Sequence, residues 1–551
     1  MKRTNKTSIY NYPLSIISLS IFISFILFSC TSHNHPGKKI FRYNETSGIA
    51  SLDPAFAKNQ SIMWAIHQLY NTLIEVDENM QLKPSLAQRW QFAADNRSIV
   101  FHLRNDVFFQ DDAAFKNGKG RRLNAQDVLY SFERIINKNT ASPGAWIFNN
   151  RVDSINPFLA IDDSTFQLNL LQPFQPILGI LSMQYCSIVA SEVVEKYGND
   201  FRRHPVGSGP FSFVAWEEGQ ALVLKKNEHY FETDSSGYSL PYLDGIKINF
   251  YDSKATEFLE FQQQRLDFIN DIDPSFKDEM LTKTGNLKKE WEGKLQLQKH
   301  PYLNIEYFGI LADTSNELLR SSPLRQKKIR QAINYAIDKK KMMLYLRNSI
   351  GTAAESGFVP PGLPSFNADD VRGYAYDPAK AKQLLEEAGY GDGKNMPVIK
   401  LLTIPIYVNL ASYVANELKQ AGLNVQVESI QKSLLLEQTS KSQALFFRGS
   451  WIADYPDAEN YLSVFYSKNP APPNYTRYKN ITYDFLYEKS LAETNDSNRY
   501  KIYRQMDKLI VEDAPVVPLW YDMALHFVHS NIKNFTPNSL NMLELRKVKK
   551  D

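Results

Sequence analysis

Two stretches of the chain repeat apolar residues at helical spacing. Between residues 125 and 136 the apolar positions recur every three or four residues, and Asn124 followed by Asp127 supplies a capping pair at the start. Residues 329–337 carry a second stripe of the same kind, built from Ile and Ala. Both stretches therefore predict helices with one buried face.

Residues 377–427 predict a helix followed by a strand–helix–strand unit. Asp377-Pro378 is a typical cap and first-turn pair, and Gly389 ends the apolar stripe that follows. Residues 398–402 then indicate a strand, an amphipathic stretch stops at Gly422, and residues 423–427 alternate between apolar and polar. A strand–helix–strand unit of this length is typical of an α/β region.

Shorter strands are predicted at residues 211–214, 222–224 and 246–250. The 551 residues exceed what one hydrophobic core of roughly 250–300 residues supports. The pattern as a whole predicts a mixed α/β chain folded in two or three lobes.

The N-terminus has the pattern of a targeting segment. Lys2, Arg3 and Lys6 precede an apolar run over residues 14–28, which ends at Ser29-Cys30. Leu27–Cys30 resembles a bacterial lipobox, and this resemblance implies a signal peptide over residues 1–29, cleavage before Cys30 and a diacylglycerol on its thiol. An uncleaved signal anchor is the alternative. Residues 30–40 are expected to form a flexible tether.

Charge and cysteine content narrow the possible functions. The net charge of +3 equals the charge of residues 1–29, so the remaining chain is close to neutral and a nucleic-acid-binding surface is not expected. Two cysteines exclude a four-thiolate metal site. Cys186 lies in an apolar stretch and is expected to be buried rather than nucleophilic.

No enzyme motif is complete. His526 and His529 lie three residues apart without a His-Glu-x-x-His frame, so metal ligation is not expected. Gly207-Ser208-Gly209 lacks the frame of a nucleophile elbow, and a tight turn is the better interpretation. No metal site and no cofactor are expected, and an enzyme is the weaker hypothesis.

Nine blocks, in this order, resemble the extracytoplasmic solute-binding proteins of peptide ABC transporters. They are Ser51–Pro54, Leu82–Trp90, Ile99–Arg104, Phe108–Asp112, Leu123–Ser131, Gly207–Phe211, Leu240–Asp244, Ile329–Asp338 and Trp451–Asp457. The resemblance implies a two-lobed periplasmic-binding-protein fold with a hinge and an additional sub-domain. It assigns residues 41–72, 205–303 and 520–546 to the first lobe, 73–204 to the extra sub-domain and 304–519 to the second lobe.

The resemblance also implies ligand-binding residues. Asp454 takes the position that holds the peptide's α-ammonium group in relatives, and Trp451 and Tyr455 belong to the same block. Arg448 lies six residues earlier, where an arginine of oligopeptide-binding relatives meets the ligand's carboxylate. A cap at a turn for Asp454 and a surface ion pair for Arg448 are the structural alternatives.

Three further residues are expected near the ligand: Asn270 in a ligand-facing loop, Tyr307 near the hinge, and Trp146 from the extra sub-domain. The basic residue that binds the carboxylate in dipeptide-specific relatives has no match in Tyr407–Leu410, which argues against strict dipeptide specificity.

The expected protein is a monomeric, lipid-anchored receptor of the bacterial cell envelope, facing the periplasm or the cell exterior. It is expected to bind a short peptide between its lobes and deliver it to the permease subunits of an ABC transporter. The alternatives are the same fold with another solute, such as a nickel chelate, haem or an oligosaccharide, or a secreted hydrolase.

Overall fold

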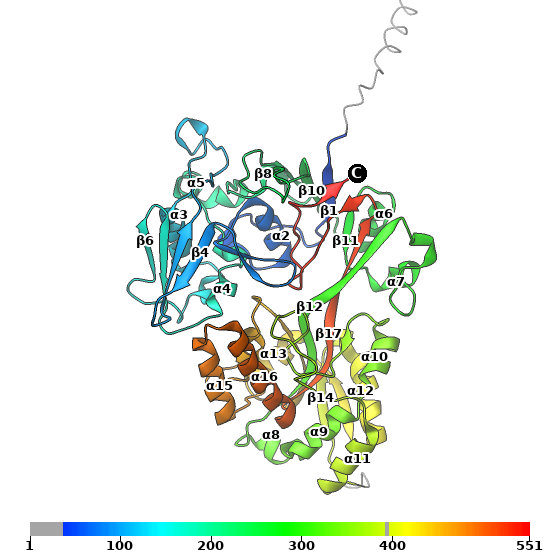
Figure 1. The fold of residues 1–551 in the computed structure, drawn as a ribbon. Helices are drawn as coiled ribbons and strands as arrows, with labels where there is room; N and C mark the ends of the chain where they lie inside the picture. Colours follow the sequence, from blue (N-terminus) through cyan, green and yellow to red (C-terminus); the bar gives the residue numbers. More distant parts are fainter. Residues whose placement is uncertain (1–36, 392–395) are drawn as a thin grey trace, which may run out of the picture. The chain divides into compact units, whose positions relative to one another are not determined.

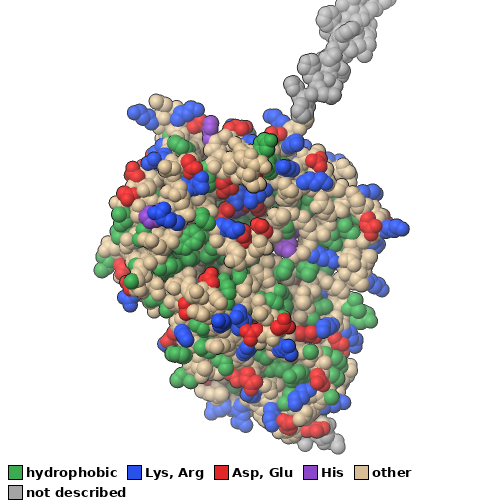
Figure 2. All heavy atoms as spheres, viewed as in Figure 1, with side chains coloured by type: hydrophobic (Ala, Val, Ile, Leu, Met, Phe, Trp, Pro, Cys, Tyr) green, Lys and Arg blue, Asp and Glu red, His purple; other side chains and the backbone are tan. Residues whose placement is uncertain are grey.

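The computed structural model describes residues 37–391 and 396–551, and residues 40–551 form one compact unit (Figure 1 as a ribbon, Figure 2 with all heavy atoms). The predicted signal peptide (1–29), Cys30 and residues 31–36 of the predicted tether lie outside the described residues. No helix in the described part of the chain is long and apolar enough to cross a membrane.

The seven-stranded sheet is organised around two long antiparallel strands, β12 (Leu295–Ile310) and β17 (Val516–His529), which run together through the molecule in Figure 1. Their pairing is irregular between Pro301 and Ile305, where both strands pass from one part of the molecule to the other. We name the part containing residues 40–301 and 523–551 lobe I, and the part containing residues 305–521 lobe II. The remaining strands of this sheet are β11 (Phe268–Asn270), β13 (Thr352–Ala353), β14 (Ile399–Thr403), β15 (Val425–Ser429) and β16 (Phe446–Ile452).

Lobe I contains two four-stranded sheets. The first has the order β1 (Ile40–Asn44), β10 (Gly245–Asn249), β9 (Ala221–Lys226) and β8 (Phe211–Glu217), and α2 (Gln60–Leu69) packs on it. The second has the order β4 (Ala87–Phe92), β5 (Ser98–Leu103), β7 (Thr165–Asn169) and β6 (Phe158–Asp162). Helix α3 (Ala125–Ile136) lies against β6 and β7, and its capping box between Asn124 and Asp127 confirms the predicted start.

The smaller elements of lobe I complete the list: β2 (Ile74–Val76), β3 (Leu82–Pro84), α4 (Ile177–Ile180), α5 (Ser191–Tyr197), α6 (Lys254–Gln262), α7 (Pro274–Met280), β18 (Ile532–Lys533) and β19 (Lys549–Lys550).

Lobe II has two large hydrophobic cores, on opposite faces of its part of the long sheet, and a smaller cluster around Leu402, Leu435 and Phe447. The first core is formed with α9 (Lys327–Tyr335), α10 (Lys339–Leu346), α11 (Pro378–Glu387) and α12 (Val408–Ala421). The second is formed with α14 (Glu459–Leu462), α15 (Ile481–Ala492) and α16 (Asp496–Asp513). Helices α8 (Glu317–Arg320) and α13 (Lys432–Ser440) complete this lobe.

The predicted strand–helix–strand unit is present as β14, α12 and β15. The two strands pair in parallel, and α12 ends at Gly422, whose φ of 103° is left-handed and suits glycine. Asp377 caps α11 through the backbone N–H of Lys380, as the Asp377-Pro378 pair predicted.

Gly207 and Gly209 bring a turn against α2. A Cβ on Gly207 would lie 2.2 Å from the carbonyl oxygen of Leu69, so only glycine fits here. Ser208 between them is buried and donates a hydrogen bond to Asn71, which gives this segment a structural role.

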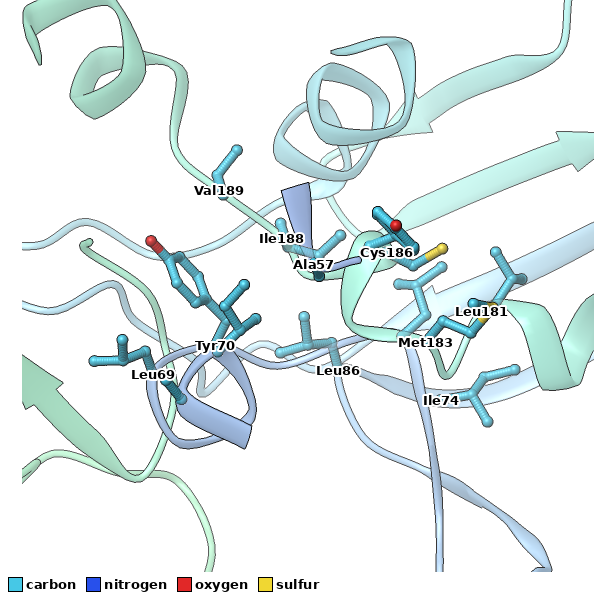
Figure 3. Packing of buried hydrophobic residues seen from close by; sticks show 14 of the residues in the cluster. Ala57, Leu69, Tyr70, Ile74, Leu86, Leu181, Met183, Cys186, Ile188 and Val189 are labelled. Atoms are coloured by element: carbon cyan, nitrogen blue, oxygen red, sulfur yellow. The ribbon is translucent and has the colours of Figure 1, made fainter. Parts of the chain in front are cut away.

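Cys186 lies in the core of lobe I, as expected. Leu181, Met183 and Ile188 pack around it (Figure 3), and burial raises the pKa of its thiol. The protonated thiol is a poor nucleophile.

Candidate binding cleft between the lobes

A cavity of about 630 Å³ lies where lobe I, the crossing strands and lobe II meet. Lobe I contributes residues of α2, the segments around 70–85 and 182–187, and residues 536–547. Tyr302 and Leu303 line it at the crossing, and Ile452, Ala453, Asp454 and Pro456 line it from lobe II. A ligand in this cavity would touch both lobes.

Asp454 presents its carboxylate to this cavity. Its side chain is accessible to solvent and makes no ion pair with any residue that the structure describes. Although this side chain reaches the cavity, the protein around it reduces the hydration of the carboxyl and so raises the pKa of Asp454 above its usual value; a hydrogen bond from Asn460 and the charge of Arg151 oppose this shift. A carboxylate in such a place gains from a cationic partner.

Asn460 fixes the orientation of the Asp454 carboxylate. Its amide nitrogen lies 3.4 Å from Asp454 Oδ2, and its Oδ1 accepts hydrogen bonds from the Asp454 backbone N–H at 3.3 Å and from Trp451 Nε1 at 2.9 Å. Trp451 therefore supports Asp454 from behind, through Asn460, rather than forming a wall of the cavity.

Trp146 and Tyr185 line the same cavity from lobe I. Burial, together with the charge of Asp454, raises the pKa of Tyr185 to about 12, so the phenol lies within electrostatic reach of that carboxylate. A Cβ on Gly144 would lie 2.4 Å from the Tyr185 ring, so glycine allows the ring to pack beside the Trp146 loop.

The other predicted residues do not line the cavity. Tyr455 is buried, and its hydroxyl donates to the buried carboxylate of Glu459. Tyr307 is buried in the second core of lobe II, with its ring over Gly449. Asn270 lies one layer behind the cavity wall, 3.4 Å from the side chain of Gln60, which does line it.

Arg448 is paired inside the protein. Its Nη2 donates to both carboxylate oxygens of Glu306 at 2.6 Å, and its guanidinium lies 4.2 Å from the centre of the Tyr407 ring. The side chains of Arg448 and Glu306 are 12% and 4% exposed. The alternative of a surface ion pair is therefore wrong in one respect, because the pair is buried.

A network of charges that the sequence did not predict supports the lobe I wall. Arg546 lies 2.8 Å from Glu75, 3.0 Å from Glu232 and 3.3 Å from Glu544. Burial opposes ionisation of Glu544, but Arg546 and the hydrogen bond with His67 lower its pKa to about 2. Glu75 and Arg546 are 471 residues apart, and no local motif announces their contact.

Two lysines on the cavity wall are not neutralised. Lys58 and Lys547 are exposed and form no ion pair with a described residue. Among the described residues the cavity thus carries the free carboxylate of Asp454 on lobe II, and two free ammonium groups and the exposed carboxylate of Glu78 on lobe I, so it offers partners for a ligand with both charges.

A second cavity, of about 650 Å³, lies within lobe I beside α3. Among the described residues its lining comes from segments 50–62, 130–140 and 194–202, with none from lobe II. A movement of one lobe against the other would not enclose a ligand there, so we take the cleft with Asp454 as the candidate site.

The histidines of the C-terminal segment have structural partners. His526 bonds to Asn541 and His529 to the carbonyl oxygen of Phe261. Burial lowers the pKa of His526 to about 3. Across residues 37–391 and 396–551, no group of three or more His, Cys, Asp or Glu side chains is arranged to hold a metal ion.

The family profile and the relatives that match this chain all describe binding proteins. A family profile described as bacterial extracellular solute-binding proteins, family 5, matches residues 81–473. Heme-binding protein A of Haemophilus influenzae is 27% identical over 85% of this chain and 84% of its own length. The dipeptide-binding protein of Escherichia coli is 24% identical over 86% of this chain and 87% of its own length.

Solved structures share the two-lobed fold. The periplasmic binding protein DppA of Helicobacter pylori, in complex with the peptide STSA, superposes with a TM-score of 0.68 at 24% identity, covering 93% of this chain and 98% of that chain.

Proposed function

This chain belongs to the bacterial extracellular solute-binding proteins of family 5, and on that premise we propose that it binds short peptides with a free amino terminus between its lobes and delivers them to an ABC transporter permease. Its relatives are solute-binding proteins rather than enzymes.

The unpaired carboxylate of Asp454 is the observation that carries this proposal. A zwitterionic peptide loses hydration at both ends when a cleft closes around it, so each charged end needs a partner. Asp454 is oriented by Asn460, and burial disfavours its charge until a cation arrives. We assign it to the peptide's α-ammonium group, with Trp146 and Tyr185 as the opposite wall.

The lobes are proposed to close around the ligand by rotation at the crossing of β12 and β17. The rotating bodies are lobe I and lobe II. At the crossing they differ from the predicted first lobe (41–72, 205–303 and 520–546, with its sub-domain 73–204) and second lobe (304–519) only at residues 302–304 and 520–522, because Trp520 and Tyr521 pack in the cores of lobe II. Because the ligand contacts both bodies, it shifts the equilibrium toward the closed state. Cleavage before Cys30 and lipid on its thiol would keep this monomeric receptor at the membrane surface, facing the periplasm or the cell exterior.

Haem is the second candidate ligand, because the Haemophilus influenzae relative is named for it and Met63 and His67 both line the cavity one turn apart on α2. The two candidates differ in a simple measurement: bound haem gives the purified protein a strong visible absorption, whereas a peptide gives none.

The test is mass spectrometry of the material that remains bound through purification, followed by calorimetry with a mixture of short peptides. Recovery of peptides, and binding of the mixture by the emptied protein, are expected. Recovery of haem, or of no peptide together with no binding of the mixture, would contradict the proposal.

A further inference from the structure

Among the described residues of the cleft wall, carboxylates outnumber cations at one place, the cluster around Arg546. Glu75, Glu232 and Glu544 lie 2.8, 3.0 and 3.3 Å from this single guanidinium. Glu75, Glu544 and Arg546 line the cavity, whereas Glu232 does not. The other charged residues of the wall balance in number: Asp77, Glu78 and Asp454 against Lys58, Lys83 and Lys547. The cleft therefore carries excess negative charge, and this excess lies at the Arg546 cluster.

The excess persists when one of the three carboxyl groups is protonated. Burial raises the pKa of Glu232, so this group takes up a proton most readily. Although burial opposes ionisation of Glu544, its pKa is about 2, so it remains charged. His67, 3.2 Å from Glu544, adds a positive charge only when it is protonated. Glu75 pairs with Arg546 through Oε1 alone, which leaves its Oε2 for another donor.

Ser85 is an unused polar group on the same face of the β2–β3 hairpin as Glu75. It lines the cavity and is 3% exposed, and its hydroxyl has no hydrogen-bond partner in the described part of the chain. Glu75 lies opposite Lys83, and the backbone N–H of Ser85 donates to the carbonyl oxygen of Leu73. Since side chains alternate along a strand, Ser85 and Glu75 are diagonal neighbours, with Cα atoms about 7–8 Å apart.

The β2–β3 hairpin lies against lobe II close to the segment of Asp454. Met80 at the hairpin turn belongs to the second core of lobe II, and Val76, next to Glu75, packs against that core. The same core contains Ala453, the residue directly before Asp454. An extended chain covers about 3.3–3.6 Å per residue, so a tripeptide with its amino end at Asp454 extends over roughly 10 Å of the cavity that both residues line.

We propose that Glu75 and Ser85 bind the cationic side chain of a ligand residue, so that the cleft selects peptides containing arginine or lysine. This inference rests on the proposed function, because it names the class of side chain that the same cleft takes. The guanidinium or ammonium group donates to Glu75 Oε2 and to the Ser85 hydroxyl, while Arg546 keeps Glu232 and Glu544. Such charge-assisted hydrogen bonds are stronger in a partly buried place than at an open surface.

The test compares arginine with citrulline, which has nearly the same shape but no charge. Ala-Arg-Ala and Ala-Ala-Arg, each with its citrulline counterpart, are measured by calorimetry at pH 8, where an ordinary histidine is neutral. The wild type is expected to prefer arginine in at least one position by roughly 10- to 100-fold, the range for a hydrogen bond to a charged group. In Glu75→Gln, which keeps an acceptor for Arg546, the ratio should fall to within about threefold of one.

Two further variants separate the contact from a general effect of charge. Ser85→Ala should lower the arginine-to-citrulline ratio about threefold to tenfold, the range for one neutral hydrogen bond. Glu228→Gln is the matched control, because Glu228 is an exposed carboxylate of lobe I that lies outside the cleft. Its ratio should equal that of the wild type.

A second measurement needs no peptide. Agmatine carries a guanidinium group but no peptide group, and it is compared with sodium chloride of equal ionic strength at pH 8. Agmatine is expected to raise the Tm of the wild type and of Glu228→Gln, but not that of Glu75→Gln. If no peptide binds to any form while agmatine acts as expected, the peptide assignment fails and the cation subsite stands. A ratio near one in the wild type, a ratio that survives in Glu75→Gln, or no effect of agmatine on the wild type overturns the inference.

Discussion

Pro456 of lobe II packs against Gly179 of lobe I. A Cβ on Gly179 would lie 3.4 Å from Pro456 Cδ, and the backbone N–H of Gln175 donates to the carbonyl oxygen of Leu491 at 3.0 Å nearby. Tyr455, next to Pro456, is buried in the hydrophobic core of lobe I. The lobes therefore meet at a second place besides the two crossing strands, directly beside Asp454.

This contact predicts that a large side chain at residue 179 would push the two lobes apart. Gly179→Leu should weaken peptide binding by about tenfold or more, because the lobes no longer approach as closely, and it should enlarge the molecule in small-angle scattering. Gly179→Ala is the control, since its Cβ only reaches ordinary contact distance. Equal affinities of the two variants would show that the contact plays no part in closure.

The buried carboxyl of Asp507 predicts a pH dependence of stability. Its pKa is about 7 in the folded protein and near 4 when unfolded. Between these values the folded state binds more protons, so the contribution of Asp507 to stability falls as pH rises through this window and levels off above pH 7. Asp507→Asn removes this carboxyl. The free energy of unfolding of the variant minus that of the wild type, measured by urea unfolding, should therefore rise by about 3 kcal/mol from pH 5 to pH 8.

Glu437→Gln is the control for this measurement. Glu437 is exposed, and the hydrogen bond from Lys441 lowers its pKa, so the variant should not gain on the wild type at higher pH. A relative stability of Asp507→Asn that does not change with pH would contradict the prediction.

The proposed lipid anchor predicts a change of cell fraction. Cys30→Ser should release the protein from membranes and abolish incorporation of labelled lipid, because the thiol is the attachment point. Cys186→Ser is the matched control, since Cys186 is buried in lobe I and should have no effect on either readout. Membrane retention of Cys30→Ser would count against the anchor.

Local patterns in the sequence predicted the elements whose signals lie within a few residues. The cap of α3, the cap of α11 and the strand–helix–strand unit of β14, α12 and β15 all follow from such signals. The two crossing strands could not be found this way, because β12 pairs with β17 more than 200 residues further along the chain.

The candidate site likewise combines residues that a local motif indicates with contacts between distant residues that no local motif indicates. Asp454 and Trp146, two of the residues that the resemblance implied, line the cleft, and their contact with a ligand stays a prediction. The pairing of Arg448 with Glu306 and the contacts of Arg546 with Glu75 and Glu232 join residues that are 142 to 471 positions apart, so only the folded chain reveals them. Tyr455 and Tyr307 are aromatic residues next to the cleft that serve the cores instead.

The binding of a peptide's amino end by Asp454 is the central claim, and a double comparison tests it most directly. Tri-alanine and N-acetyl-tri-alanine are measured against the wild type and Asp454→Asn, with Glu78→Gln as a control carboxylate of the same cavity. A hydrogen bond to a charged group is worth about 1.5–3 kcal/mol, or roughly 10- to 100-fold in affinity. The wild type and Glu78→Gln should prefer the free amine by that factor, and Asp454→Asn should lose the preference. An undiminished preference in Asp454→Asn would contradict the claim.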